Sequence, residues 1–210
     1  MTPDLVILDC DGVLVDSEPI SCRVLTEHLV AEGFPMTMEE VEDACMGRPW
    51  SNNVEVIEGR FGRPLPDGFE RRYHEELFTT FDAELRAVPG VEEALDALEL
   101  PTCVASSGTH DRIRHTLGLT GLLPRFEGRI FSATDVARGK PAPDLFLHAA
   151  AAMGAAPERC TVVEDRPAGV QAARAARMGV LGFAARSDGG RLAAEGARVF
   201  ADMRELPNLL

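Results

Sequence analysis

The sequence predicts an α/β fold, with a Rossmann-like parallel-sheet core that is interrupted after its first strand by an all-helical insertion. Short apolar runs alternate with helical segments after Gly90, and this alternation is typical of a parallel sheet with helices on both faces. Between Pro19 and about Arg86, in contrast, helical segments follow one another with no strand between them. The predicted core therefore comprises residues 1–16 and 88–210, and the insertion comprises residues 17–87.

The first strand is predicted at Leu5–Leu8, a short apolar run that stops abruptly at Asp9-Cys10-Asp11-Gly12. Such a run is typical of a buried strand that opens into a loop at its carboxyl end. In the insertion, breaks that contain glycine and proline separate long amphipathic segments, which indicates consecutive helices. These helices are predicted at Cys22–Glu32, Met38–Met46, Asn52–Phe61 and Asp67–Leu85.

The second part of the core continues with alternating elements. Its strands are expected at Thr102–Ala105, Arg129–Phe131, Cys160–Val163 and Val180–Phe183. Its helices are expected at Val91–Leu98, Asp111–Leu117, Asp144–Met153 and Ala168–Met178, and a last short helix and strand end the chain.

The charge balance narrows the possible partners. The 210 residues include 21 Lys+Arg and 34 Asp+Glu, a net charge of −13, which argues against nucleic acid because that affinity depends on lysines and arginines. No apolar run approaches the roughly 20 residues of a membrane helix, so no membrane partner is expected. The five cysteines form no C-x-x-C pair, which indicates a reduced compartment, and the predicted location is cytoplasmic. A small anionic substrate would need a local positive group.

Polar residues follow several predicted strands directly, and the ligand crevice of such sheets lies at the carboxyl ends of the strands. These residues are Asp9 and Asp11, Ser106, and the pair Glu164-Asp165. Several carboxylates that converge on one crevice suit Mg²⁺, which prefers hard oxygen ligands. Taken singly, each aspartate could equally be a helix cap or a turn residue.

Two further features complete a possible site. Ser106-Ser107-Gly108 precedes a helix, where a hydroxyl and backbone N–H groups can bind an anion or simply cap the helix. Lys140 lies before Pro141 in a loop, and by itself it would be read as a solvated surface lysine. In combination, metal-binding carboxylates, a hydroxyl and a lysine are the parts that phosphoryl transfer needs.

Four ordered motifs resemble those of the haloacid dehalogenase-like (HAD) hydrolase superfamily. They are Asp9-Cys10-Asp11-Gly12-Val13-Leu14-Val15-Asp16-Ser17-Glu18, Val104-Ala105-Ser106-Ser107-Gly108, Gly139-Lys140-Pro141-Ala142-Pro143-Asp144 and Val162-Val163-Glu164-Asp165. The resemblance is to the subgroup of β-phosphoglucomutase and 6-phosphogluconate phosphatase, which carries a helical cap. It implies that the insertion is such a cap, with hinges near Val15–Pro19 and Arg86–Gly90.

The resemblance also implies a role for each motif residue. Asp9 would be the nucleophile that forms an aspartyl-phosphate, and Asp11 would be the general acid and base, with Lys140 as the third catalytic residue. Ser106, Ser107 and Lys140 would bind the phosphate. Mg²⁺ would be held by Asp9, Asp11 through its backbone carbonyl, Asp165, and Glu164 directly or through water. Dehalogenases of the superfamily lack the second aspartate, so Asp11 favours phosphate chemistry.

The implied function is a Mg²⁺-dependent phosphatase of a small sugar or polyol phosphate, such as 6-phosphogluconate, that works as a monomer or weak dimer. Substrate contacts are expected at Ser17, Gly47, Trp50 and His110, although Trp50 could instead belong to the aromatic core of the cap. The mutase of this subgroup carries a lysine and an arginine in place of Met46 and Trp50, and a histidine in place of Ser21. Their absence favours hydrolysis. A phosphomutase and a non-catalytic binding protein of the same fold are the alternatives.

Two arginines also depart from the pattern of the family that the sequence resembles. Arg166 stands where the fourth motif usually has serine, and it could bring positive charge to the mouth of the site or point into solvent, which is the preferred interpretation. Arg177 replaces a usual glycine before Met178 and is expected to be a surface change without a catalytic role.

Overall fold

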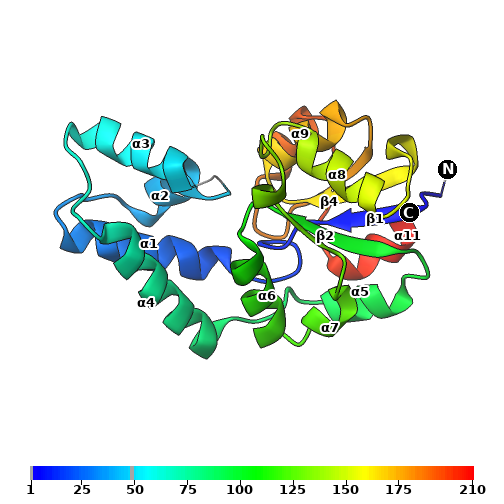
Figure 1. Cartoon of the computed structure of the whole chain (residues 1–210), viewed down its shortest axis with the longest axis horizontal. Helices are drawn as coiled ribbons and strands as arrows, with labels where there is room; N and C mark the ends of the chain where they lie inside the picture. Colours follow the sequence, from blue (N-terminus) through cyan, green and yellow to red (C-terminus); the bar gives the residue numbers. More distant parts are fainter. Residues whose placement is uncertain (1, 48–49) are drawn as a thin grey trace. The chain divides into compact units, whose positions relative to one another are not determined.

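The computed structural model describes residues 2–47 and 50–210 of the chain. It divides the chain into two compact units, one formed by Met1–Val15 with Arg86–Leu210 and the other by Asp16–Leu85. The first is an α/β unit and the second is entirely helical in its regular structure, as Figure 1 shows. None of the helices in the described ranges has the length and apolar character that would let it cross a membrane.

The α/β unit is built on a six-stranded sheet in which every pair of neighbours is parallel. The strands are β1 Leu5–Leu8, β2 Thr102–Ser106, β3 Ile130–Ser132, β4 Cys160–Glu164, β5 Gly179–Phe183 and β6 Arg198–Phe200, in the spatial order β3-β2-β1-β4-β5-β6. The predicted parallel α/β core is therefore confirmed, and β1 lies between β2 and β4 at the centre of the sheet.

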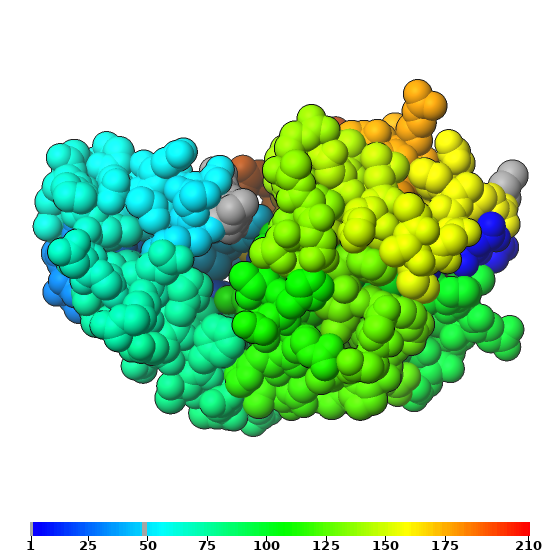
Figure 2. Space-filling model, in the orientation of Figure 1, coloured from blue at the N-terminus to red at the C-terminus, as the bar shows by residue number. Residues whose placement is uncertain are grey.

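Helices cover both faces of this sheet. They are α5 Val91–Ala97, α6 His110–Leu119, α7 Leu123–Phe126, α8 Asp144–Ala152, α9 Pro167–Ala175, α10 Gly189–Ala194 and α11 Leu206–Leu209, with short 3₁₀ turns at Ala133–Asp135, Pro157–Arg159 and Met203–Glu205. In Figure 1, α8 and α9 lie on one side of the sheet and α5, α7 and α11 on the other. Most of the visible face of this unit in Figure 2 is formed by segments coloured green to yellow, with orange segments along the upper edge and blue N-terminal residues at the right.

The alternation of side chains along β1 explains why this strand is apolar throughout. Leu5 and Ile7 join a buried cluster that includes Leu145, Phe146 and Val170 from α8 and α9. Val6 and Leu8 point to the opposite face, because successive side chains of a strand alternate, and they are also fully buried. A strand that is buried on both faces needs apolar residues at every position, and β1 ends where the first carboxylate begins.

The helical unit contains α1 Glu18–Ala31, α2 Met38–Cys45, α3 Trp50–Phe61 and α4 Phe69–Glu84. Thr37 starts α2 with a reciprocal capping box, in which its hydroxyl accepts the N–H of Glu40 and the Glu40 carboxylate accepts the N–H of Thr37. Large apolar side chains from several of these helices form the interior of the unit: Leu25, Leu29, Ile57, Leu77 and Phe81.

The segments at the boundary between the two units pair with each other inside the α/β unit. Val15 forms an antiparallel bridge with Ala87, and the N–H of Val88 donates to the carbonyl of Leu14 over 3.0 Å. The chain thus leaves and re-enters the α/β unit at adjacent points.

Two local differences from the sequence-based expectation have simple causes. Helix α1 begins at Glu18 rather than at Cys22, because Pro19 falls in the first turn, where its missing N–H costs nothing. The short helix α7 was not expected, since its four residues carry too little periodicity to be recognised.

Candidate active site

The three central strands end at one edge of the sheet, and each ends at a polar residue of the motifs. Asp9 directly follows β1, while Ser106 and Glu164 are the last residues of β2 and β4. Because β2, β1 and β4 are neighbours in the sheet, these residues are brought to the same edge. Polar side chains that the sequence separates by more than 150 positions therefore share one region.

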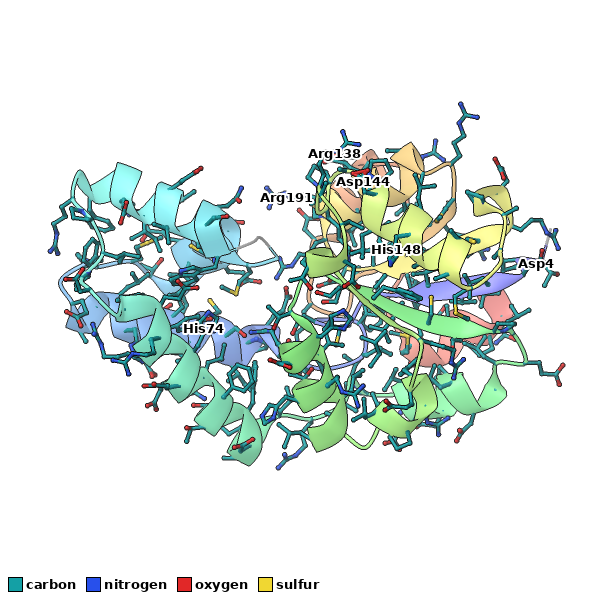
Figure 3. All side chains as sticks on the ribbon, viewed as in Figure 1. Asp4, His74, Arg138, Asp144, His148 and Arg191 are labelled. Atoms are coloured by element: carbon teal, nitrogen blue, oxygen red, sulfur yellow. The ribbon has the colours of Figure 1, made fainter. Side chains whose placement is uncertain are left out.

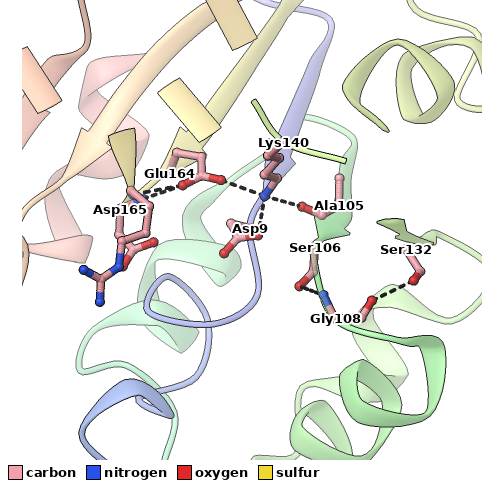
Figure 4. A network of polar contacts seen from close by, with 9 residues as sticks. Asp9, Ala105, Ser106, Gly108, Ser132, Lys140, Glu164 and Asp165 are labelled. Carbon is pink, nitrogen blue, oxygen red and sulfur yellow. Dashed lines mark hydrogen bonds and ion pairs between the residues drawn. The ribbon is translucent and has the colours of Figure 1, made fainter. Parts of the chain in front are cut away.

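Lys140 connects these strand ends, as Figure 4 shows. Its ammonium group donates to Asp9 Oδ1 over 2.6 Å, to Glu164 Oε1 over 2.6 Å and to the carbonyl of Ala105 over 3.1 Å. Only 5% of the Lys140 side chain is exposed, against 10% for Asp9 and 2% for Glu164. The lysine is therefore a buried counter-ion of two carboxylates, and it is the only lysine in the chain.

The loop that carries Lys140 is itself held at both ends. Arg138 and Asp144, which Figure 3 labels, form a two-bonded ion pair with distances of 2.8 and 2.9 Å. A pair of this geometry is directional as well as charged, so it favours one conformation of the intervening residues.

Burial and the charge of the ion-pair partner shift the pKa in opposite directions, both for Asp9 and for Lys140. Burial raises the pKa of Asp9 to about 7, against the lowering effect of Lys140 and with a further rise from Glu164. Burial by itself would lower the pKa of the Lys140 ammonium, but the carboxylates of Asp9 and Glu164 raise it above its ordinary value. The lysine thus stays charged, whereas burial shifts the pKa of Asp9 above that of an exposed aspartate.

Glu164 is held at both oxygens. Oε1 accepts from Lys140, and Oε2 accepts the backbone N–H groups of Asp165 and Arg166, each over 3.0 Å. This folded-back conformation occupies the space beside Gly169 in α9, where a Cβ atom would lie 1.8 Å from Glu164 Oε1. Gly169 is therefore required by the conformation of Glu164, a dependence that the sequence reasoning missed.

Three buried carboxylates could hold a cation. Oxygen atoms of Asp9, Glu164 and Asp165 all lie within 4.8 Å of one another. Asp165 Oδ2 accepts from the hydroxyl of Ser187 over 3.4 Å and fits against Gly12, where a Cβ atom would approach to 2.3 Å. This set of hard oxygen donors fits a divalent cation such as Mg²⁺.

The second motif forms a loop between β2 and α6. The N–H of Gly108 donates to Ser106 Oγ over 3.1 Å, and Ser132 Oγ donates to the carbonyl of Gly108 over 2.6 Å. Ser107 lies half-buried between them. Ser106 and Ser107, the residues predicted to bind phosphate, thus lie where the chain passes from β2 to α6.

The side chain of Asp11 is hydrogen-bonded to Arg112. The guanidinium of Arg112 donates to Asp11 Oδ1 over 3.0 Å, and both side chains are about four-fifths buried, with exposures of 20% and 24%. Sequence reasoning missed Arg112, because nothing in the helix pattern shows which residue of α6 faces a loop that lies 101 positions away.

The residues expected to contact substrate lie in both units. His110 is in the α/β unit, where its Nε2 lies 2.8 and 3.0 Å from the carboxylate oxygens of Asp135. Ser17, Gly47 and Trp50 belong to the helical unit. Ser17 is fully buried at the start of α1, and Gly47 has a left-handed φ of 71° after α2. Trp50 stacks on Tyr73, with ring centroids 5.3 Å apart, so it packs against another aromatic residue of the helical unit.

The predictions for Arg166 and Arg177, the two arginines that depart from the family pattern, have different outcomes. The preferred interpretation that Arg166 points into solvent is wrong, because its side chain is only 21% exposed and its Nε lies 3.6 Å from Asp165 Oδ2. The attraction of the buried carboxylate outweighs hydration of the guanidinium. Arg177 is exposed, as expected, and has a positive φ of 62°, which explains why a glycine suits this position.

Comparisons with known proteins agree with this architecture. A model of the haloacid dehalogenase-like hydrolases matches residues 3–177. The chain is 33% identical over 207 residues to the 6-phosphogluconate phosphatase of Escherichia coli, covering 98% of this chain and 94% of that protein. It is 33% identical over 190 residues to the hexitol phosphatase A of the same organism, covering 89% and 85% of the two chains.

A solved structure of a haloacid dehalogenase-like protein from Agrobacterium tumefaciens superimposes with a TM-score of 0.87 at 37% identity, over 98% of this chain and 96% of the other. Both the fold and the sequence thus match over almost the whole length. The chain therefore belongs to the haloacid dehalogenase-like hydrolase family, as its four motifs predict.

Proposed function

We propose that the chain is a Mg²⁺-dependent phosphatase that hydrolyses a small phosphorylated carbohydrate through an aspartyl-phosphate on Asp9. One observation carries this proposal above the others: the ammonium of Lys140 lies 2.6 Å from both Asp9 and Glu164 in a buried group that also includes Asp165. A carboxylate can attack a phosphate monoester, itself an anion, only where positive charge offsets the repulsion.

In the first step, a carboxylate oxygen of Asp9 attacks the phosphorus atom, and the bond from phosphorus to the ester oxygen breaks. Asp11 in its protonated form gives its proton to the departing alcohol. Lys140 stays charged and stabilises the negative charge around the phosphoryl group, while the loop of Ser106 and Ser107 binds phosphoryl oxygens.

In the second step, the Asp11 carboxylate takes a proton from water as that water attacks the phosphorus atom. The bond from phosphorus to the Asp9 oxygen breaks, inorganic phosphate leaves, and Asp9 and Asp11 return to their starting states. The same side chain therefore serves as acid in one direction and as base in the other.

Asp9, Asp165 and the backbone carbonyl of Asp11 would hold Mg²⁺, with Glu164 contributing directly or through water. The bound ion supplies charge neutralisation at the phosphate. Because Glu164 already holds Lys140 and two backbone N–H groups, its principal task in this proposal is to fix the lysine.

The substrate class rests on the relatives, which are named for 6-phosphogluconate and hexitol phosphates. Met46 and Trp50 offer no charge for a second phosphate, which favours hydrolysis over transfer to another sugar. The helical unit would act as a cap that closes over a small phosphorylated substrate and excludes bulk water, with hinges at Val15–Pro19 and Arg86–Gly90.

The test is phosphate release from a panel that contains 6-phosphogluconate, hexitol phosphates and fructose 1-phosphate, with Mg²⁺ and after its removal by a chelator. Turnover should require the metal, and Asp9→Asn should reduce it to background, whereas Asp82→Asn at an exposed position of α4 should not. Metal-dependent turnover in the Asp9→Asn variant would contradict the covalent mechanism. Strict dependence on an added sugar bisphosphate would show a phosphomutase instead, and a chain inert to the whole panel would point to a binding protein.

A further inference from the structure

We infer that Arg112 is a positioning residue for the proton-transfer step, and that it holds the carboxyl group of Asp11 where the leaving alcohol and the attacking water must meet it. This inference rests on the proposed function, in which Asp11 is the general acid and base. It assigns a role to a side chain outside the four motifs.

The contact between the two side chains is direct and partly shielded from water. Arg112 Nη2 donates to Asp11 Oδ1 over 3.0 Å, and about four-fifths of each side chain is buried. Hydrogen bonds between ionised groups are roughly twice as strong as those between neutral groups. A planar guanidinium is also more rigid than an ammonium group, so it fixes orientation as well as charge.

The path of the Arg112 side chain shows that the surrounding loop accommodates it. A Cβ atom on Gly108 would lie 3.3 Å from Arg112 Cδ and 3.6 Å from Ser106 Oγ. The arginine stem therefore crosses close over Gly108, in the loop that is proposed to bind phosphate. At its origin, the backbone N–H of Arg112 donates to the Thr109 hydroxyl that caps α6.

Arg112 thereby joins the loop after β1 to the first turn of α6. The loop proposed to bind the phosphoryl group and the side chain proposed to exchange the proton are connected through one arginine. Because proton transfer requires hydrogen-bond distances, a carboxyl group that loses this anchor would spend less time in a productive orientation.

The role can be separated from phosphate binding by varying the leaving group. An alkyl phosphate, such as the sugar phosphate that the wild-type protein hydrolyses best, needs a proton on its departing oxygen. The p-nitrophenolate ion leaves readily without one. In the first step, transfer of the phosphoryl group to Asp9, a variant with a misplaced general acid should therefore be impaired with the first substrate and much less with the second.

For Arg112→Met we expect kcat/KM, which reports the steps through departure of the leaving group, to fall about tenfold or more with the alkyl phosphate and less than about threefold with p-nitrophenyl phosphate. The attack of water is common to both substrates, so kcat should fall with both of them. Arg112→Lys should recover part of the loss. Arg114→Met is the matched control, because Arg114 lies on the same helix and pairs with the exposed Glu127.

Equal losses of kcat/KM with both substrates, together with weaker inhibition by inorganic phosphate, would overturn the inference and make Arg112 a phosphate ligand. An unchanged or increased kcat/KM with the alkyl phosphate would also overturn it. Thermal melting of each variant identifies a loss that comes from unfolding, and Arg112→Gln replaces the methionine variant if that one does not fold.

Asp11→Asn in the same assay separates this inference from the proposed function. If Asp11→Asn shows the leaving-group dependence and Arg112→Met does not, the positioning role fails and the acid/base role of Asp11 stands. If Asp11→Asn shows no such dependence, the proposed role of Asp11 fails, and the positioning role fails with it.

Discussion

Asp9 and Asp11 are separated by a single residue, yet they lie in different surroundings. Asp9 is nine-tenths buried and contacts Lys140, which also holds Glu164. Asp11 is about one-quarter exposed and contacts Arg112 from a helix. The proposed nucleophile is thus fixed in a buried ionic group, while the proposed acid and base is more accessible and is hydrogen-bonded to an arginine. A nucleophile benefits from rigid placement, whereas a proton carrier must reach both the leaving group and water.

The largest effect should come from the centre of the buried group. Lys140→Met leaves Asp9 and Glu164 buried without their counter-ion, so we expect the free energy of unfolding to fall by about 3 kcal/mol and turnover to be lost. Urea denaturation and phosphate release measure the two effects. The double variant with Glu164→Gln should regain stability but not activity, and a single variant as stable as the wild type would show that the ion pairs are weak.

The next prediction tests whether the buried ionic group depends on the space that Gly169 leaves beside Glu164. Gly169→Ala places a Cβ atom 1.8 Å from Glu164 Oε1, so Glu164 must move and release Lys140. We expect a loss of about 2 kcal/mol in unfolding free energy and a lower kcat.

Gly59→Ala is the matched control, because Gly59 lies in helix α3 with no atom within 4 Å of its added Cβ. It should gain roughly 0.5–1 kcal/mol, as alanine does in an open helical position. Stabilisation by both substitutions would mean that Glu164 can move without consequence.

A third prediction concerns pH. Burial raises the pKa of Asp9 to about 7, so the metal-free folded protein binds this proton more tightly than the unfolded chain, whose value is near 3.8. This contribution to stability is fully present below the unfolded value and is lost as the pH rises through 7.

A metal ion needs the ionised carboxylate, so Mg²⁺ should bind more tightly at pH 8 than at pH 6, by about tenfold, with release of a proton. Calorimetry in buffers of different ionisation enthalpy measures both quantities. Binding that is independent of pH and releases no proton would show that Asp9 is already ionised at pH 6.

The smallest effect is expected at a position that belongs to the surroundings of neither Asp9 nor Asp11. Arg177 holds a positive φ of 62° at an exposed position, so Arg177→Gly should add about 1 kcal/mol to the unfolding free energy. Activity should not change, and a clear change in kcat would connect this turn with the site.

The parts of the site that the sequence predicts are those that depend on strand ends. Asp9, Ser106 and Glu164 each follow or close an apolar run, and parallel strands bring such positions to one edge. The sequence does not predict contacts that depend on the path of a loop or on a side-chain rotamer. The pairing of Arg112 with Asp11 and the inward direction of Arg166 belong to this class, because both arginines lie in patterns that an exposed residue would also satisfy.

Because Lys140 is the only lysine among 210 residues, the chain carries a natural reporter at the centre of its buried group. Lysine labelled with ¹⁵N and ¹³C would give a single set of side-chain resonances, with no mutation and no assignment problem. The shift and proton exchange of that ammonium would follow the arrival of a cation or a phosphate directly. The resistance of this lysine side chain to acylating reagents, followed by peptide mapping, would also show how often the buried group opens to solvent.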